Sequence, residues 1–213
     1  MLMSNQIITE IHVDLDNRDK STALFRLFLA VPVLIFLSSF SEFADDLPGV
    51  LGGLLVLPVV LSMLFRNVYP SYVLAFNKAL LELSNRVTAY VLVLTDEYPS
   101  IEANQKVRLI YPEIDGGKKL SAWKPLVKWF LAIPLFLLGV IYAIYAFALT
   151  LISWFSVITK GFYPEDKAEE VIKVIAYWNR LYGYALLLVT DEYPSFSLNS
   201  RSETLFLTSP FGR

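Results

Sequence analysis

Adjacent carboxylates and Asn-Arg pairs are the residues whose type and spacing could support chemistry in this sequence. Each pair occurs twice, in the same order along the chain. A charged residue within or beside an apolar stretch is costly unless it is paired or reaches polar surroundings. The candidate structural or headgroup-contacting positions are therefore Asn85, Arg86, Asp96, Glu97, Asn179, Arg180, Asp191 and Glu192.

Two interpretations of these residues stay open. In the functional one, Asp96-Glu97 and Asp191-Glu192 pair with Arg86 and Arg180 as a charge network, or form an ion or lipid-headgroup site. In the structural one, each carboxylate pair is a polar stop after an apolar run, and each arginine reaches to phosphates or to the acid downstream. We favour the structural interpretation, because adjacent side chains converge on one point only where a turn makes them do so.

The composition excludes several kinds of active site. The chain has no cysteine and one histidine, His12, which removes thiolate metal sites, Cys nucleophiles and multi-histidine sites. The sequence contains no phosphate-binding glycine loop, dinucleotide fingerprint, serine elbow or zinc-binding His-Glu motif. We therefore expect no catalytic, cofactor-binding or metal-binding residue, and a protein that is not an enzyme. A net charge of −2 gives no basic field for nucleic acid.

Hydrophobic residues dominate the chain and point to the lipid bilayer as its partner. They make up 55% of the 213 residues, whereas charged residues make up 18%, compared with about 25% in globular domains. Residues 27–41 and 129–159 contain no charged side chain. The residues before the first apolar run are acidic and lack a basic region, so we interpret that run as a retained span and not as a signal peptide.

The order of these features repeats along the chain. Each copy opens on a basic residue followed by an Ala-x-Pro step, at Arg26–Pro32 and at Lys128–Pro134. Each then passes through an apolar segment, a Tyr-Pro and an Asn-Arg, and ends on Thr-Asp-Glu-Tyr-Pro-Ser, at 95–100 and at 190–195. The repeat predicts two tandem copies of one structural unit.

The expected fold is mainly α, a polytopic membrane protein in which each copy holds a strand, a transmembrane helical hairpin and an amphipathic helix. Apolar runs of this length match a hydrocarbon core of about 30 Å, and the amphipathic segments repeat with helical spacing. Repeat 1 is expected at 6–100, with spans at about 22–40 and 48–65 and an amphipathic helix at 71–94. A cytoplasmic linker with a short strand follows at 101–125. Repeat 2 is expected at 126–196, with a hairpin at about 126–159 and an amphipathic helix at 165–189, and a polar tail follows at 197–213.

Two features of the membrane topology have alternatives. Residues 126–159 form either a tight hairpin turning near Gly139–Tyr142, which the repeat favours, or one long helix of about 45 Å. If the amphipathic helices also crossed the bilayer, the two copies would be inverted. The basic residues decide for two spans per copy, because the N-terminal flank and the linker are both rich in Lys and Arg and the segment at 41–46 is acidic. We expect a multi-pass protein of the cell (inner) membrane with both termini cytoplasmic.

At these residues the chain resembles a bacterial integral-membrane family catalogued only as a domain of unknown function. Its members show a basic residue before Leu-Ala-Ile-Pro, paired spans, and an Arg-containing helix that ends in Thr-Asp-x-Tyr-Pro-Pro-Phe. Residues 26–32 and 128–134 match the opening, and residues 86–99 and 180–196 match the close. Ser100 and Ser195 replace the second proline, Ile101 replaces the phenylalanine in copy one, and Lys128 stands for the arginine. The resemblance implies a small multi-span membrane protein and no activity.

The sequence thus favours a non-enzymatic membrane protein of unknown molecular activity, serving as a scaffold or an accessory subunit of a membrane complex. Its partners would be the bilayer and another membrane protein or a second copy of itself. The alternative is a small transporter, channel or lipid-handling protein with a site between the two repeats. The near absence of ionisable residues inside the expected spans argues against ion or proton transport.

Overall fold

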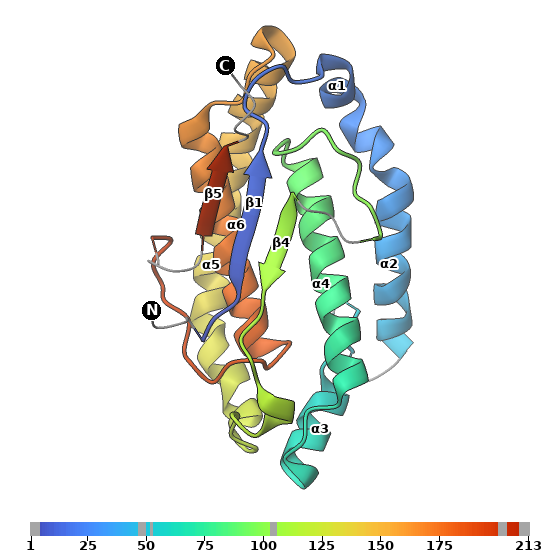
Figure 1. Ribbon diagram of the computed structural model, residues 1–213, viewed down its shortest axis with the longest axis vertical. Coiled ribbons are helices and arrows are strands. Elements are labelled where there is room, and N and C mark those ends of the chain that lie inside the picture. The colour runs from blue at the N-terminus through green and yellow to red at the C-terminus, as the bar shows by residue number, and fades with distance from the viewer. Residues whose placement is uncertain (1–4, 47–49, 52, 103–105, 200–203, 209–213) are drawn as a thin grey trace.

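The computed structural model describes residues 5–46, 50–51, 53–102, 106–199 and 204–208, with the side chains of 41–51 and 204–208 left out. The chain is mainly helical (Figure 1). Its elements are β1 (Ile8–Val13), α1 (Lys20–Leu29), α2 (Val31–Asp46), β2 (Val50–Leu51), β3 (Leu54–Leu55), α3 (Leu57–Arg66), α4 (Ser71–Val91), β4 (Val107–Ile110), the short 3-10 helix η1 (Asp115–Gly117), α5 (Lys124–Lys160), α6 (Glu165–Ala185) and β5 (Thr204–Thr208).

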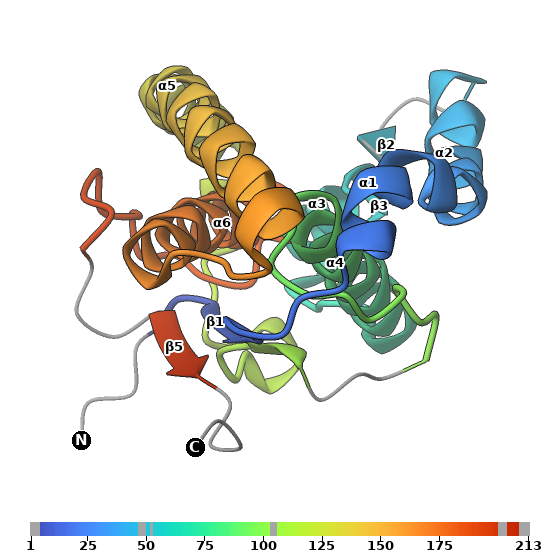
Figure 2. The same cartoon turned by 90° about the horizontal axis from the view of Figure 1, so that it is seen from above.

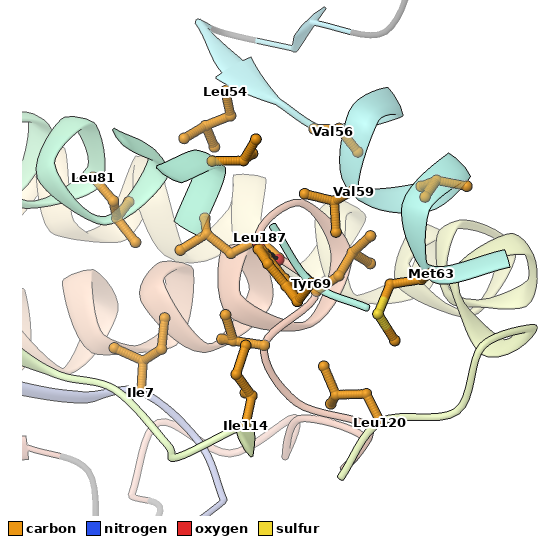
Figure 3. Close-up of a cluster of buried hydrophobic side chains, with 14 of the residues drawn as sticks. Ile7, Leu54, Val56, Val59, Met63, Tyr69, Leu81, Ile114, Leu120 and Leu187 are labelled. Carbon is orange, nitrogen blue, oxygen red and sulfur yellow. Dashed lines mark hydrogen bonds between the residues drawn. The ribbon is translucent and has the colours of Figure 1, made fainter. Parts of the chain in front are cut away.

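These elements form three layers, which Figure 2 shows from above. A three-stranded sheet lies on one side, α4 and α6 occupy the middle, and α1–α2 and α5 lie on the side opposite the sheet. The largest cluster of buried hydrophobic side chains joins α3, α4 and β4 to the segment after α6 (Figure 3). The middle layer is therefore covered on both sides.

The sheet connects the two halves of the sequence. Its order is β4-β1-β5, with β1 antiparallel to β4 and parallel to β5. β1 and β4 coincide with the alternating segments that the sequence indicated. Within the polar tail, Thr204–Thr208 forms a strand that pairs with the free edge of β1.

α1 and α2 replace the first expected span and extend it. Lys20–Phe40 is one of two helical stretches in the described residues that are long and apolar enough to cross a membrane. Pro32 stands in the first turn of α2, where the missing N–H of proline is tolerated. The acidic segment at 41–46, expected as a loop, continues the backbone of α2 to Asp46.

The second expected span, at 48–65, is wrong. The short strands β2 and β3 pair there, and α3 has only 10 residues, or about 15 Å. Gly53 between the strands has φ +85°, a conformation that glycine adopts without strain. The chain thus turns back before it enters α3, and no span-length helix forms.

The tight hairpin expected near Gly139–Tyr142 is also wrong. α5 runs without interruption for 37 residues, from Lys124 to Lys160, which is about 55 Å. Gly139 is helical and faces Trp178, whose Cζ2 would lie 2.9 Å from a Cβ at this position. The glycine therefore permits close packing of α5 on α6 instead of a turn. α5 is the second stretch apolar enough to cross a membrane.

α4 and α6 begin at the residues predicted for the two amphipathic helices, but they are not helices with one free polar face. Arg86 and Arg180, expected on the polar face, are 5% and 0% exposed. Tyr72, expected on the apolar face, is 75% exposed. The difference arises because other segments pack there. The sheet covers one side of the layer that α4 and α6 form (Figure 2), and the loops that follow these helices accept from Arg86 and Arg180 at the carbonyls of Ser100 and Ser197.

Candidate functional site

Asp96 lies in a cluster of cations at the start of α1. Arg18 donates to both of its carboxylate oxygens, from Nε at 2.8 Å and from Nη2 at 2.7 Å. Arg26 in α1 donates to the same carboxylate, and the backbone N–H of Asp19 donates to Oδ2 at 3.0 Å. The side chains of Arg18 and Arg26 are 0% and 2% exposed. One carboxylate thus binds two desolvated guanidinium groups.

Asp191 has a matching cluster at the start of α5. The ammonium group of Lys128 lies 2.8 Å from its Oδ1, and that of Lys124 lies 3.4 Å from its Oδ2. The backbone N–H of Ser121 donates to Oδ2 at 2.8 Å. Lys128 is 2% exposed and Lys124 is 41% exposed. The second cluster therefore has one buried cation and one that reaches solvent.

Further contacts around the two clusters occur at corresponding positions. Arg26 donates to the carbonyl of Thr95, and Lys128 donates to that of Thr190. The Arg26 guanidinium lies 4.7 Å from the ring centroid of Tyr90, and the Lys128 ammonium lies 5.3 Å from that of Tyr184. A second tyrosine packs edge-on against each ring, with Tyr98 against Tyr90 and Tyr193 against Tyr184. Cation–π contact adds to the ion pair in each cluster.

The same backbone turn places each aspartate. Val93 and Leu188 both have positive φ, at 66° and 58°, which is strained for branched residues and persists only where the surroundings enforce it. Past this point the side chain of Thr95 accepts from the backbone N–H of Glu97, and Thr190 does so from Glu192. The turn brings the carboxylate back to the start of the apolar helix of its own half.

The charge network that the functional interpretation places between the acids and Arg86 or Arg180 does not form. Arg86 donates to the carbonyls of Ser100 and Glu102, at 2.8 and 2.7 Å, and contacts Glu82 in its own helix at 3.4 Å. Arg180 donates to the carbonyl of Ser197 at 3.0 Å. Both arginines fasten the loop that follows the Thr-Asp-Glu turn. The cations that hold the acids are instead Arg26 and Lys128, which open each repeat.

Sequence reasoning missed these cation–acid pairs, although a signal for them was present. Arg26 and Lys128 precede the Ala-x-Pro step at the same position of both copies, as Asp96 and Asp191 follow the same threonine. A basic residue beside an apolar run needs an acid, and the repeat offers one in each copy. Arg18 had no such signal, since Leu120 stands at the corresponding position before Ser121.

The side chain of Glu97 points away from the Asp96 cluster, and Glu192 is exposed. Glu97 lies 3.8 Å from the ammonium group of Lys106, which also binds Asp14 at 2.6 Å. Glu192 contributes its backbone carbonyl to Gln6 at 2.7 Å. The adjacent carboxylates of the first copy therefore bind different cations. Among the residues that the structure describes, no group of three His, Cys, Asp or Glu side chains could hold a metal ion.

Asn85 and Asn179 meet in the centre of the molecule. The amide nitrogen of Asn85 donates to Oδ1 of Asn179 at 2.9 Å, and that of Asn179 donates back to Asn85 at 2.7 Å. Asn179 also donates to the hydroxyl of Thr9 in β1, at 2.9 Å. All three side chains are buried. This reciprocal pair links α4, α6 and β1, and it satisfies polar groups that would be costly to bury alone.

Both aspartates are ionised in the ordinary range of pH. Burial alone would raise the pKa of Asp96, but hydrogen bonds from Arg18 and the charges of Arg18 and Arg26 hold it below its usual value. Burial likewise opposes ionisation of Asp191, and the hydrogen bond from Lys128 together with the Ser121 amide holds its pKa below the usual value. Each carboxylate therefore remains a permanent countercharge.

Two of the cavities that adjoin these residues are lined by α5. An apolar groove of about 330 Å³ lies above the asparagine pair between α4, α5 and α6, and its lining includes Asn85, Asn179, Ala143 and Trp178. A second pocket of about 440 Å³ opens at the start of α5, beside Lys124, Lys128 and Asp191. The first lies between the two halves of the sequence, whereas the second belongs to the Asp191 cluster.

Comparison with known proteins adds no relative from which a role for these residues could be transferred. No protein-family model matches the chain, and neither does any curated protein or solved structure. The resemblance to a membrane family of unknown function stays a prediction.

Proposed function

We propose that this chain is a non-enzymatic membrane protein, built from two copies of one unit, that serves as a scaffold or accessory subunit and is held in the bilayer by the layer opposite the sheet. The observation that carries the proposal is the exposure of that layer. Large hydrophobic side chains face outward along α1, α2 and α5, among them Phe25, Leu27, Phe28, Ile35, Phe130, Ile133, Leu137, Ile141, Ile144, Phe147, Ile152 and Phe155. A continuous apolar surface of this kind marks a membrane or protein contact.

Matching contacts support the two-copy plan. The cation–acid pair, the aromatic ring against the cation, the strained residue and the threonine turn recur at corresponding positions of both halves. Asn85 and Asn179, which also correspond, contact each other. Contacts between corresponding residues are what a pseudo-twofold axis between α4 and α6 produces.

The position of the sheet favours an orientation in which the helices lie along the membrane plane. The strands run beside the helices and share their direction (Figure 1). If α5 crossed the bilayer, the sheet edges β4 and β5, the exposed Arg108, and Lys78 and Glu82 of α4 would lie at hydrocarbon depth. Open sheet edges and unshielded charges do not occur there. With the apolar layer immersed instead, the sheet faces water.

Length and charge support the same orientation. About 55 Å of helix exceeds a hydrocarbon core of about 30 Å. Arg18 and Lys20 lie near the Lys160 end of α5, since Lys20 donates to the carbonyl of Thr159, and Lys118 and Lys119 lie near its Lys124 end. Basic residues favour the cytoplasmic side, and immersion from one leaflet places both ends there. Crossing the bilayer would place one end outside.

The polar residues singled out in the sequence support a non-enzymatic role. Asp96 and Asp191 hold cations of their own copy, and Arg86 and Arg180 fasten loops. Asn85 and Asn179 hold each other. Each of these side chains is thus engaged in joining segments of the chain, which is the role expected of structural residues.

Single cysteines at the two ends of α5 test the orientation, since the chain has none of its own. Ser21→Cys and Lys118→Cys both replace exposed side chains. Protein in sealed right-side-out and inverted membrane vesicles is treated with a membrane-impermeant thiol reagent. We expect both positions to label in the same vesicles, the inverted ones. Labelling of the two positions in opposite vesicles would establish a crossing and restore the polytopic plan.

Membrane attachment itself is tested by flotation. The purified protein is mixed with phosphatidylcholine vesicles and centrifuged through a density gradient, and we expect it to float and to resist extraction by carbonate. A variant with Phe28→Asp and Phe155→Asp, both at exposed positions, should float less. Wild-type protein that stays at the bottom of the gradient would overturn the proposal.

A second candidate function, lipid handling, is favoured by the groove between the copies. The groove of about 330 Å³ is lined mainly by apolar side chains of α4, α5 and α6, and it opens on the immersed layer, where an acyl chain could enter. Ala143 lies on its rim and is exposed, so Ala143→Trp should fill it without disturbing the core. We expect transfer of fluorescent phospholipid between vesicles to fall in this variant, and unchanged transfer would exclude the role.

A further inference from the structure

The two cation–acid clusters differ in the cation beside the backbone N–H that binds the aspartate. Asp19 and Ser121 correspond, since each donates its backbone N–H to the aspartate of its copy. The preceding residue is Arg18 in the first copy, where it binds both oxygens of Asp96. In the second copy it is Leu120, which is buried in the hydrophobic core. The space that a guanidinium fills in one copy is therefore not filled by its counterpart in the other.

A pocket of about 440 Å³ adjoins the second cluster. Lys124, Lys128, Asp191, Tyr184 and Tyr193 contribute its polar and aromatic wall. The two ammonium groups and the one carboxylate leave a net positive charge. Lys128 is turned to Asp191 and the carbonyl of Thr190, whereas Lys124 is 41% exposed and 3.4 Å from the carboxylate. Because an ammonium group has three donors, Lys124 can bind an anion while it keeps this contact.

The rest of the pocket wall is apolar and belongs to the immersed layer. Trp123, Val127 and Leu131 line it from the start of α5, and they are 62%, 39% and 46% exposed. Tryptophan and tyrosine side chains favour the level of lipid headgroups. A ligand that fits this wall carries an anionic group for the lysines and a hydrocarbon part for Val127 and Leu131.

We propose that this pocket binds the phosphate of an anionic phospholipid, with Lys124 as the principal contact and the acyl chains along Val127 and Leu131. The proposal rests on the membrane attachment argued above. A zwitterionic lipid is disfavoured, because its choline would bring a third cation to the two lysines. In the register that pairs Arg26 with Lys128, Thr22 of the first copy stands at the position of Lys124, so the principal contact has no counterpart there.

The test compares two lysine variants of equal charge in the full-length protein. Lys124→Gln removes the pocket lysine, and Lys160→Gln removes the lysine at the opposite end of the same helix. Val127→Trp fills the pocket without a change of charge. Each protein is reconstituted into phosphatidylcholine vesicles that contain spin-labelled phosphatidylglycerol or spin-labelled phosphatidylcholine, and the motionally restricted fraction of each label gives the lipid preference.

We expect wild type and Lys160→Gln to prefer phosphatidylglycerol, and Lys124→Gln to lose about fivefold of that preference, the effect of one lysine near an anionic surface. Val127→Trp should lose it as well. Equal loss in the two lysine variants would overturn the proposal, because the preference would then follow overall charge. Displacement of the lipid by millimolar inorganic phosphate would overturn the assignment to a lipid.

The experiment separates this inference from the proposed function. Wild-type protein that floats with phosphatidylcholine vesicles but shows no preference for phosphatidylglycerol would overturn the pocket and leave the membrane attachment standing. Wild-type protein that does not float would overturn both. Circular dichroism of each reconstituted variant checks that the fold is kept, which we expect since Lys124, Val127 and Lys160 all lie at the surface.

Discussion

At the scale of single residues, Asp96 is the countercharge on which two buried arginines depend. Removing one partner of a buried ion pair leaves an uncompensated charge and costs about 3 kcal/mol. Asp96→Asn would leave Arg18 and Arg26, 0% and 2% exposed, without that carboxylate. We expect the variant to lose about this much stability, measured as a fall in the thermal unfolding midpoint in a mild detergent.

Asp191→Asn is the matched control, because it removes the corresponding acid of the other copy. Only Lys128 is buried there, and Lys124 can turn to solvent. The control should therefore lose less stability than Asp96→Asn. An equal or larger loss of stability in Asp191→Asn would contradict this expectation. It would show that the second buried guanidinium of the Asp96 cluster does not increase the stability that depends on Asp96.

The lowered pKa of Asp96 also predicts a dependence on acid. Its ordinary value is 3.8, and its folded-state pKa lies below that, so the unfolded chain binds the proton more readily. The stabilisation is therefore complete above the ordinary pKa and is lost as pH falls through the folded pKa, in the range below about 4. We expect the unfolding midpoint of the wild type to fall in this range more steeply than that of Asp96→Asn. Parallel curves would contradict the assignment.

At the scale of elements, α4 and α6 are joined by the reciprocal amide pair. Asn85→Leu alone leaves buried groups of Asn179 without their partner, at a cost of about 1–3 kcal/mol for each unsatisfied group. Replacing both asparagines by leucine removes the mismatch. In a double-mutant cycle we expect the combined loss in unfolding free energy to be smaller than the sum of the two single losses, by an interaction energy of about 1 kcal/mol or more.

Thr9→Val supplies the control for this cycle, since it removes the third member of the network while keeping the shape of the side chain. Its loss should shrink in the Asn179→Leu background. Strict additivity of the asparagine substitutions would mean that the two helices are held by packing alone, and that the amide pair is incidental.

The same scale shows which elements a single sequence reveals. β1, β4, α4 and α6 follow from alternation and helical spacing, which are local signals. The continuity of α5 does not follow from local signals, because Gly139 is compatible both with a turn and with a close contact between helices. Only the packing of Trp178 against Gly139 distinguishes the two. α3 was predicted as part of a span because residues 54–61 are all Leu or Val except Pro58. The paired strands before α3 shorten the helix.

At the scale of the whole molecule, the sequence predicted long apolar helices, two of which the described residues contain, but not how the two halves of the chain meet. Equivalent residues were visible in the repeat, yet the contact of Asn85 with Asn179 and the insertion of β1 between β4 and β5 depend on long-range pairing. Arg18 reaches the site because of the turn before α1, and the periodicity of the sequence does not predict that turn. Site residues that recur in the sequence repeat could thus be predicted, whereas residues that long-range packing brings to the site could not.

Because β1 pairs only with strands from the second half among the described residues, neither half contains the complete three-stranded sheet. Further contacts cross the same boundary, including Tyr69 Oη to the carbonyl of Leu187 at 2.6 Å and Gln6 to that of Glu192. Fragments 1–102 and 106–213 expressed together should therefore assemble in the membrane, and a tag on one should copurify the other. Expressed alone, each should be degraded.

Ile11→Asp in β1, at a position that is 0% exposed, should abolish copurification, whereas Leu27→Gln on the exposed face of α1 should preserve it. If either fragment accumulated alone as a stable, protease-resistant membrane protein, the copies would be independent domains, and a pseudo-twofold unit that folds through its shared sheet would be the wrong description of this chain.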